Sequence, residues 1–264
     1  MKTPFIFFVL LVAASISSNG QDKKLFERQL FIQGEDTLPC RILTPIDFKE
    51  GKKYPLIIFL HGAGERGNNN EAQLTWGADL FLDSLNRKNF PAIVVFPQCP
   101  QNDKWSDYTK TSKSDSTGYV WSNEPTFSKS LRLVSTFIDT LLESKQVDKR
   151  RVYIMGLSMG GFGTLELLWR KPTVFAAAMP ICGAIDPQKI EFYKPQLPIW
   201  IFHGDKDPVI SVSNSRLLYN TLSIKNSKAK YSEYANVGHD SWKNAFAEPD
   251  FLPWLFNQKL ASKK

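Results

Sequence analysis

The sequence of 264 residues predicts one α/β domain, built on a doubly wound, mostly parallel eight-stranded sheet with helices on both faces. Continuous apolar runs recur along the chain, as expected of strands that are buried on both faces of a parallel sheet. Helical patterns separate these runs, and the clearest is 126–143, where apolar residues recur at helical spacing. The chain is 42% hydrophobic, so one domain of this length can bury a large core.

Eight segments are expected to form the strands of this sheet. Residues 27–33 and 38–44 flank the turn residues 34–36, which suits an antiparallel hairpin at the start of the sheet. The later strands are predicted at 55–60, 92–96, 151–155, 175–181, 199–202 and 231–234. Ligands bind at the carboxyl ends of the strands in such sheets, so the residues that directly follow these runs are candidates for a functional site.

The first 20 residues have the pattern of a secretory signal peptide. They hold a single lysine, an apolar stretch at 5–14 and small polar residues before Gln21, and the apolar stretch is too short to span a bilayer comfortably. The alternatives are a buried amino-terminal helix or a retained anchor. We expect an exported protein, periplasmic or extracellular, with a signal peptide at 1–20 and one domain at 21–264.

Cysteine usage and charge exclude several classes of protein. Cys40, Cys99 and Cys182 are too few and too irregularly spaced for a disulfide framework or a zinc site. Cys99 and Cys182 follow strands that two other strands separate in the expected sheet, about 14 Å at the usual strand spacing, so we expect mostly unpaired thiols. The net charge is +7 without a basic stripe of interleaved aromatic residues, so neither a nucleic-acid partner nor stable membrane insertion is expected.

The most informative motif is a Gly-x-Ser-x-Gly corner at 156–160. The predicted strand 151–155 leads into it, and 164–169 has the pattern of the helix that should follow. A nucleophilic serine in such a corner lies on a strained turn, and small residues two positions before and after it let strand and helix pack closely. The alternative is an ordinary glycine-rich turn. The motif makes Ser158 the candidate nucleophile.

The candidate base is found by elimination among three histidines. A serine hydroxyl needs a base to take its proton, and the base needs a carboxylate to fix its tautomer. In α/β-hydrolases, which carry such an elbow, the chain order is Ser, Asp or Glu, then His. His61 precedes Ser158, and His203 precedes every carboxylate of its own loop, which leaves His239.

The candidate carboxylate follows the predicted strand 199–202. Asp207 is preferred because it lies out in the loop, whereas Asp205 is closer to the strand and better placed to brace the turn. Asp205 and Asp186 stay open as alternatives.

An oxyanion hole needs two backbone N–H groups aimed at the developing charge. Met159 supplies one because it directly follows the nucleophile. The second is expected from the glycine-rich loop 61–67, where we assign it to Ala63, with Gly62 or Gly64 as alternatives. In the same loop we expect a structural role for His61 and a bracing pair of Glu65 with Arg66.

Substrate contacts are expected from the long polar connection 98–125. Its aromatic rings, among them Trp105, either stack on a sugar or a phenolic acid or pin the loop to the body of the protein. Trp105 is the first candidate because it follows a strand's carboxyl end. Gln98, at the start of the connection, and Trp242, close to His239, are further candidates.

Together these residues resemble the esterase branch of the α/β-hydrolases, near the dienelactone hydrolase-like, phospholipase/carboxylesterase and feruloyl esterase-type families. The resemblance covers almost the whole chain after residue 20, and its motifs are specific for fold and triad but not for substrate. It is carried by residues 61–67, 97–100, 156–161, 203–207 and 238–239.

The resemblance implies an α/β-hydrolase fold without a large cap domain, since the spacing from Ser158 to Asp207 leaves little room for one. It also implies a serine hydrolase for small-molecule or polysaccharide-linked carboxylic esters, feruloyl or acetyl esters among them, that works through an acyl-enzyme without metal or cofactor. Ser158 would attack, His239 would move the proton, Asp207 would orient His239, and Met159 and Ala63 would hold the oxyanion.

Activity is then expected to fall as His239 protonates below about pH 6.5. One alternative is a peptidase of the prolyl oligopeptidase type, although the propeller of those enzymes has no room here. Another is a binding module without catalytic activity on the same scaffold.

Overall fold

The computed structural model describes residues 22–111, 118–121, 128–225 and 228–261. The expected signal peptide at 1–20 lies outside these residues. Within them, no helix combines the length and the apolar character that crossing a membrane requires. The described chain opens with the short 3-10 helix η1 (Lys23–Leu25).

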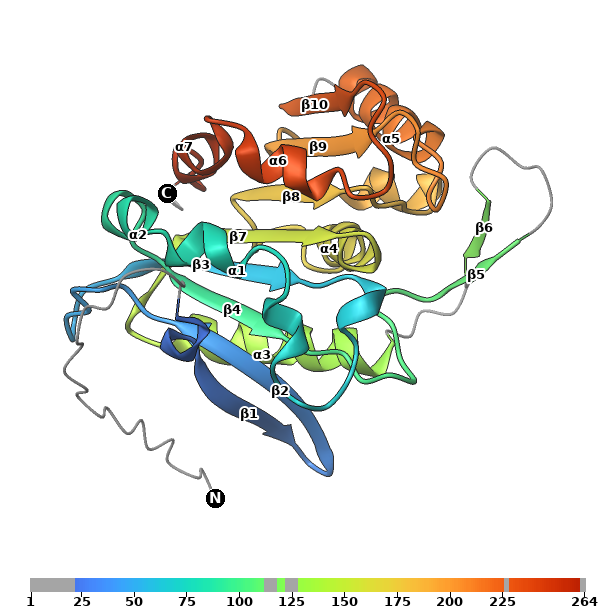
Figure 1. The fold of residues 1–264 in the computed structure, drawn as a ribbon. Helices are drawn as coiled ribbons and strands as arrows, with labels where there is room; N and C mark the ends of the chain where they lie inside the picture. Colours follow the sequence, from blue (N-terminus) through green and yellow to red (C-terminus); the bar gives the residue numbers. More distant parts are fainter. Residues whose placement is uncertain (1–21, 112–117, 122–127, 226–227, 262–264) are drawn as a thin grey trace.

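One eight-stranded sheet forms the centre of the molecule, in the order β1-β2-β4-β3-β7-β8-β9-β10 (Figure 1). Pairing is antiparallel from β1 to β2 and from β2 to β4, and parallel between all the other neighbours. This confirms the predicted α/β-hydrolase fold. The strands are β1 (Glu27–Gln33), β2 (Asp36–Leu43), β3 (Tyr54–Leu60), β4 (Ile93–Pro97), β7 (Val147–Leu157), β8 (Ala177–Ile181), β9 (Ile199–Gly204) and β10 (Ala229–Tyr234).

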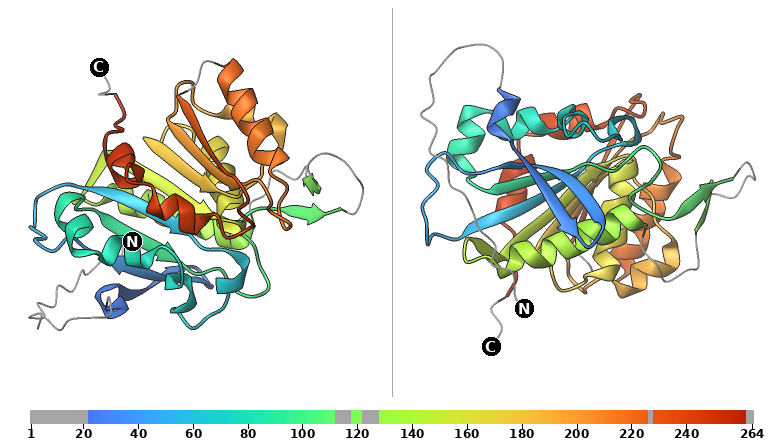
Figure 2. Two further views of the ribbon diagram at one scale, coloured as in Figure 1. Left: turned by 45° about the horizontal axis from the view of Figure 1, so that its top comes forward. Right: turned by 90° about the horizontal axis from the view of Figure 1, so that it is seen from below.

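Helices cover both faces of the sheet (Figure 2). One face carries α3 (Lys129–Glu143), α4 (Met159–Arg170) and α5 (Ser213–Ile224). The other carries α1 (Ala78–Leu82), α2 (Ser84–Asn89), α6 (Trp242–Ala247) and α7 (Phe251–Phe256). Further 3-10 helices are η2 (Ala63–Glu65), η3 (Ala72–Leu74) and η4 (Pro187–Phe192).

The continuous apolar strands supply two separate cores because successive side chains point to opposite faces of a sheet. In β3, Leu56, Ile58 and Leu60 pack into the core under α3 to α5, whereas Ile57 and Phe59 pack into the core on the other face. Every residue of β3 is therefore buried, which explains why the strand shows no polar alternation.

Two predicted elements begin four or more residues earlier in the structure, whereas the other predicted boundaries differ by at most three residues. β7 begins at Val147 rather than 151, because the register with β3 shifts there and lets Tyr54 pair with Val147. The helix after the elbow begins at Met159 rather than 164, since 160, 161 and 163 are glycines that lower helix propensity but allow close packing. Between β8 and β9 the chain holds only η4, so no cap domain is inserted there.

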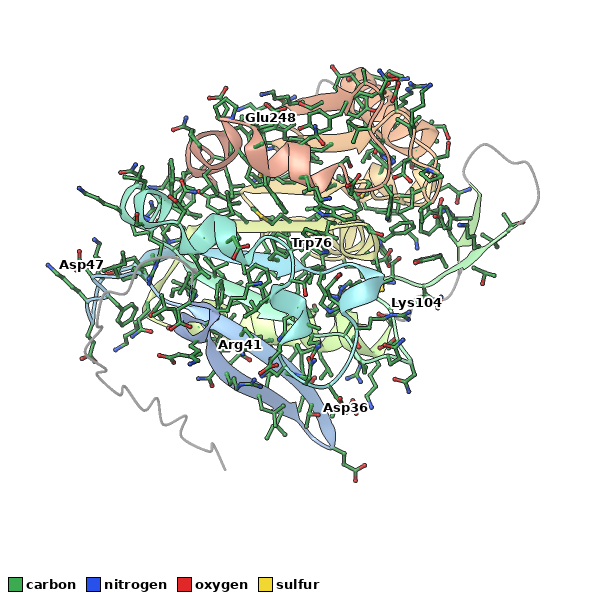
Figure 3. The ribbon with its side chains drawn as sticks, in the orientation of Figure 1. Asp36, Arg41, Asp47, Trp76, Lys104 and Glu248 are labelled. Carbon is green, nitrogen blue, oxygen red and sulfur yellow. The ribbon has the colours of Figure 1, made fainter. Side chains whose placement is uncertain are left out.

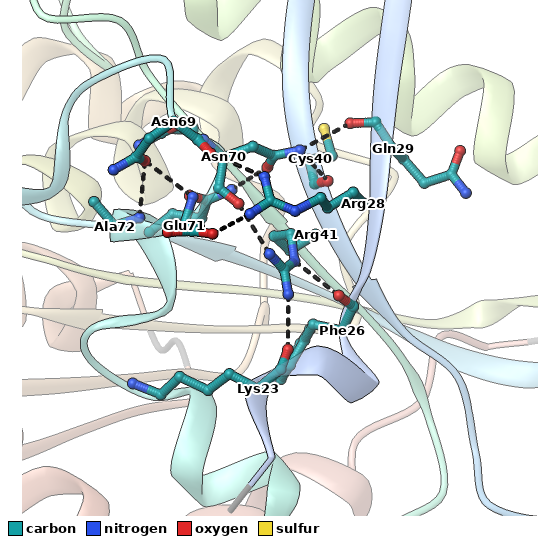
Figure 4. A network of polar contacts seen from close by, with 12 residues as sticks. Lys23, Phe26, Arg28, Gln29, Cys40, Arg41, Asn69, Asn70, Glu71 and Ala72 are labelled. Atoms are coloured by element: carbon teal, nitrogen blue, oxygen red, sulfur yellow. Dashed lines mark hydrogen bonds and ion pairs between the residues drawn. The ribbon is translucent and has the colours of Figure 1, made fainter.

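An arginine ties the start of the described chain to the loop after β3 (Figure 4). The buried Arg41 guanidinium donates hydrogen bonds to the carbonyl oxygens of Phe26 (2.7 Å), Lys23 (2.8 Å) and Asn70 (3.1 Å). Beside it, the guanidinium of Arg28 pairs with the carboxylate of Glu71. These contacts fix the far end of the loop whose beginning carries Ala63.

All three cysteines are buried and free. Cys40 lies in β2, Cys99 follows β4, and Cys182 follows β8. The strands β4 and β8 are separated by β3 and β7, as the expected strand order required.

Candidate active site

Ser158 lies at the turn between β7 and α4, at the carboxyl edge of the parallel strands. Its backbone has φ 52° and ψ −119°, a conformation that non-glycine residues adopt only under strain. A Cβ atom at Gly160 would overlap the carbonyl oxygen of Leu60, and one at Gly156 would overlap the carbonyl oxygen of Gly160. The two glycines of the motif are therefore required by backbone contact.

Two side chains from other loops reach Ser158. The Nε2 atom of His239, in the loop between β10 and α6, lies 2.9 Å from Ser158 Oγ. Its Nδ1 atom lies 2.7 Å from Asp207 Oδ2, in the loop after β9. A carboxylate only accepts hydrogen bonds, so Nδ1 carries the proton and the lone pair of Nε2 faces the serine hydroxyl. The structure thus brings together Ser158, His239 and the preferred carboxylate Asp207.

Asp207 is held by four hydrogen bonds. Its Oδ1 accepts from the N–H groups of Val209 (2.8 Å) and Ile210 (2.9 Å), and its Oδ2 accepts from His239 and lies 3.2 Å from His203 Nε2. Burial raises the pKa of Asp207, but these hydrogen bonds outweigh it and hold the pKa well below that of an ordinary aspartate. The carboxylate stays ionised at any pH at which the protein would work.

The two alternative carboxylates lie elsewhere. Asp205 Oδ1 accepts the N–H of Asn236 at 2.7 Å, so it braces the turn as expected. Asp186 caps η4 by accepting the N–H of Gln188 at 3.0 Å. Neither contacts His239 in the described residues.

His203 is a contact of Asp207 that sequence reasoning missed. The imidazole is fully buried, with Nε2 3.0 Å from the carbonyl oxygen of Ile210 and Nδ1 2.7 Å from Ser215 Oγ in α5. Since the carbonyl of Ile210 only accepts, Nε2 carries a proton and also donates to Asp207. Chain order correctly set His203 aside as the base, and its spacing of four residues from Asp207 was the only sequence signal of this contact.

At the start of α4 and of η2, backbone N–H groups beside the elbow have no acceptor within the described residues. Met159 is the first residue of α4 and Ala63 the first residue of η2, and the first N–H groups of a helical turn have no partner inside it. The loop of Ala63 runs beside the elbow, because a Cβ at Gly62 would meet the Leu157 side chain at 2.9 Å. Met159 and Ala63 stay the predicted oxyanion donors, and Gly64, in the same turn as Ala63, stays an alternative.

His61 joins the loop after β3 to the loop after β4. Its Nε2 accepts the N–H of Cys99 at 2.9 Å, and its Nδ1 donates to the carbonyl oxygen of Gly62 at 2.6 Å. Burial lowers the pKa of His61 to about 4, so the ring is neutral at neutral pH and can accept at Nε2. The structural role expected for His61 is this bridge, and it orients the Gly62–Ala63 peptide.

Because the buried His61 is neutral in the folded protein, the stability of the fold depends on pH. Between about pH 6.5 and pH 4 the unfolded chain binds a proton at this histidine that the folded protein does not bind. The free energy of unfolding should therefore fall with falling pH across this window, by about 3 kcal/mol from this group. Urea unfolding from pH 7 to pH 4 measures it, and the His61→Gln variant should show a correspondingly flatter pH dependence; equal slopes would contradict the assignment.

Two expected substrate contacts are wrong. Trp105 is completely buried in the core, and its indole Nε1 donates to the carbonyl oxygen of His61 at 3.0 Å. Gln98 is also completely buried and holds the loop after β3, donating to the carbonyl oxygen of Glu65 (3.2 Å) and to Asn69 Oδ1 (2.9 Å). Neither has a surface to offer a ligand, so both position the loop that carries Ala63.

The expected pair of Glu65 with Arg66 is also wrong, although both residues brace the loop. Arg66 donates to the carbonyl oxygens of Ala63 (3.0 Å) and Asp103 (3.4 Å). The carboxylate of Glu65 lies against Gly62, where a Cβ atom would meet its Oε2 at 3.0 Å, and burial raises the pKa of Glu65. Each side chain therefore stabilises the loop separately.

Aromatic rings flank the site on two sides. The hairpin of β5 (Tyr108–Lys110) and β6 (Tyr119–Trp121) projects beyond the carboxyl edge of the sheet (Figure 1). The rings of Tyr108, Tyr119 and Trp121 pack around Phe162 of α4, with centroids 4.6 to 5.8 Å away. These contacts hold the hairpin against α4. On the other side, Trp242 packs edge to face against His239, with ring centroids 5.5 Å apart.

One group of metal-ligating atoms overlaps the site. Donor atoms of Cys182, Asp207 and His239 lie within 4.8 Å of one another. Burial raises the pKa of the Cys182 thiol, whereas a metal binds the thiolate. Asp207 and His239 are already bonded to each other, so the donor set suits a hydrogen-bonded dyad better than an ion.

Comparisons with known proteins agree with this architecture. A family model described as phospholipase/carboxylesterase matches residues 44–249. A solved thermostable esterase superposes with a TM-score of 0.80 at 36% identity, covering 90% of this chain and 64% of that one. The bifunctional acetylxylan esterase/xylanase XynS20E of Neocallimastix patriciarum is 27% identical over 69% of this chain. The matched region is only 24% of the length of that enzyme.

Structural similarity extends to more distant relatives. A ferulic acid esterase from Anaeromyces mucronatus, solved in complex with ferulic acid, superposes with a TM-score of 0.60 at 16% identity. The match covers 86% of this chain and 89% of that one. At this identity the similarity shows a shared fold.

Proposed function

Because the chain belongs to the phospholipase/carboxylesterase family, we propose that it is a serine hydrolase that cleaves carboxylic esters through an acyl-enzyme. The observation that carries the proposal is the contact chain from Ser158 Oγ to His239 Nε2 (2.9 Å) and from His239 Nδ1 to Asp207 Oδ2 (2.7 Å). A nucleophile, a base and an orienting carboxylate within hydrogen-bond distance are the requirements of this chemistry.

The reaction proceeds in two transfers. His239 Nε2 takes the proton of Ser158 as Oγ attacks the ester carbonyl carbon, and the N–H groups of Met159 and Ala63 stabilise the oxyanion. The tetrahedral intermediate collapses, the bond to the alcohol oxygen breaks, and His239 returns the proton to that oxygen. Water then attacks the acyl-enzyme by the same route and releases the acid and the free serine. Asp207 stays ionised throughout and stabilises the imidazolium.

We propose that the substrates are esters on carbohydrate, with acetyl or feruloyl as the acyl group. The acetylxylan esterase/xylanase relative supports this, since that protein's name states an ester on a polysaccharide. Export, proposed from the pattern of residues 1–20, would give the enzyme access to such material. A peptidase is the rival activity.

Labelling with a fluorophosphonate probe tests the proposal. The purified protein should react at Ser158, as peptide mapping reports, and should cleave simple acyl esters faster than matched amides. Ser158→Ala is the control and should not label. Preference for amides would establish the peptidase, and absence of labelling in folded protein would favour a binding module without catalytic activity.

A further inference from the structure

The alcohol part of an ester must lie beside His239. The same Nε2 atom that takes the proton of Ser158 returns it to the departing alcohol oxygen, so that oxygen comes within hydrogen-bond distance of Nε2. The side chains beside the ring of His239 are therefore the first candidates for contact with the alcohol, rather than with the acyl group.

Two tryptophans continue outward from His239. Trp242, at the start of α6, packs edge to face on the imidazole at 5.5 Å and is itself largely buried. Trp76, just before α1, packs on Trp242 with ring centroids 5.7 Å apart and is partly exposed. Figure 3 shows Trp76 between the segment of α1 and helix α6. The two rings form a continuous aromatic surface that begins at the base and ends in solvent.

Trp76 is bordered by charged groups. The ammonium group of Lys243 lies 5.6 Å from its ring centroid and 2.8 Å from Asp240 Oδ2. An aromatic ring bordered by an ammonium group and a carboxylate fits the apolar face of a sugar ring and its surrounding hydroxyls.

The aromatic rings of the hairpin are less suited to this role. Tyr108 already stacks on Phe162 at 4.6 Å, and Tyr119 packs edge to face on the same ring. Tyr119 is buried. Tyr108 and Trp121 are partly exposed like Trp76, but the ring that they pack on is Phe162, whereas Trp76 reaches the base His239 through Trp242.

We propose that Trp76 and Trp242 form the alcohol subsite, in which Trp76 stacks on the sugar ring that carries the ester. This rests on the proposed function, because it takes His239 as the group that protonates the leaving alcohol. It adds a specificity residue, Trp76, to the reaction and assigns the alcohol of the substrate to the carbohydrate class.

Two acetyl esters that differ only in the alcohol test the subsite. The substrates are ethyl acetate and a mono-O-acetylated methyl xyloside, and the readout is the ratio of their kcat/KM values. Trp76→Ala should lower the ratio of sugar ester to ethyl ester about five- to ten-fold, mainly through KM. Trp76→Phe, which keeps a ring, should recover part of the loss. Trp169→Ala, a partly exposed tryptophan at the far end of α4, is the matched control and should leave the ratio unchanged.

A binding measurement separates failure of the subsite from failure of the hydrolase. Saturation-transfer NMR with xylobiose, cellobiose and mannobiose is run on Ser158→Ala, with and without Trp76→Ala, and needs no turnover. Sugar binding that disappears with Trp76→Ala supports the subsite even if no ester is cleaved. An unchanged ratio in Trp76→Ala, an equal loss on both esters, or sugar binding that is absent or independent of Trp76 overturns it.

Discussion

Replacing Ser158 by alanine is expected to lower kcat for a simple ester by about 10⁶-fold while the protein stays folded. The loss is large because no covalent intermediate can form, and His239 then has no hydroxyl to activate. Rates are measured with an activated ester, and folding is checked by circular dichroism and thermal unfolding. A variant that retains a tenth of the activity would show that another residue is the nucleophile.

The strained backbone of Ser158 offers a structural control for this experiment. With φ at 52°, alanine keeps the strain of serine, whereas glycine relieves it. Ser158→Gly should therefore have a free energy of unfolding about 1 kcal/mol higher than Ser158→Ala, although both are inactive. Denaturant unfolding of the pair measures the difference, and equal stabilities would mean that the turn is not strained.

Replacing Asp207 by asparagine is expected to lower kcat about 10⁴-fold. The carboxylate accepts from Val209, Ile210, His203 and His239. An amide has only one acceptor oxygen, so its NH₂ group must face some of these donors. His239 would then accept at Nδ1 and carry its proton on Nε2, where it cannot act as a base toward Ser158. Single-turnover kinetics with an activated ester measures the loss.

Asp205→Asn is the matched control, since it makes the same chemical change two residues away. Asp205 accepts a single N–H, from Asn236, and an amide oxygen can still accept it. This variant should keep near wild-type kcat. The assignment of the carboxylate would have to change if Asp205→Asn were inactive and Asp207→Asn active.

The sheet was predictable because its strands are marked locally. Each buried parallel strand is a short apolar run, and the structure contains a strand at every expected position. The errors lie at boundaries, where pairing between distant residues decides. After the buried Val147, the extra residues at the start of β7 are polar and exposed in part, and the pairing of Tyr54 with Val147 joins them to the sheet.

Some site residues were likewise predictable from local sequence, whereas others depend on contacts between distant segments. The elbow motif predicts Ser158, and chain order predicts His239, because only one histidine satisfies that order. Position in the loop favours Asp207 but leaves Asp205 and Asp186 open, and the contact with His239 distinguishes among them. Position after a strand's carboxyl end, in a long polar connection, predicts Trp105 and Gln98 at the substrate. Both side chains are completely buried. Each can be buried because it donates a hydrogen bond to a main-chain carbonyl oxygen of the loop after β3, about 30 to 45 residues earlier in the chain.

The sequence by itself determined the α/β fold, the family and the order of the candidate triad, because these follow from local apolar runs, small residues at a tight turn and position along the chain. Only the tertiary structure decided that His203 contacts Asp207, that His61 bridges two loops and that Trp76 extends the aromatic surface from His239. Each of these depends on which loops the sheet order brings together at one edge. A pattern of neighbouring residues does not encode such contacts, since side-chain burial and pairing are set by the packing of segments far apart in the chain.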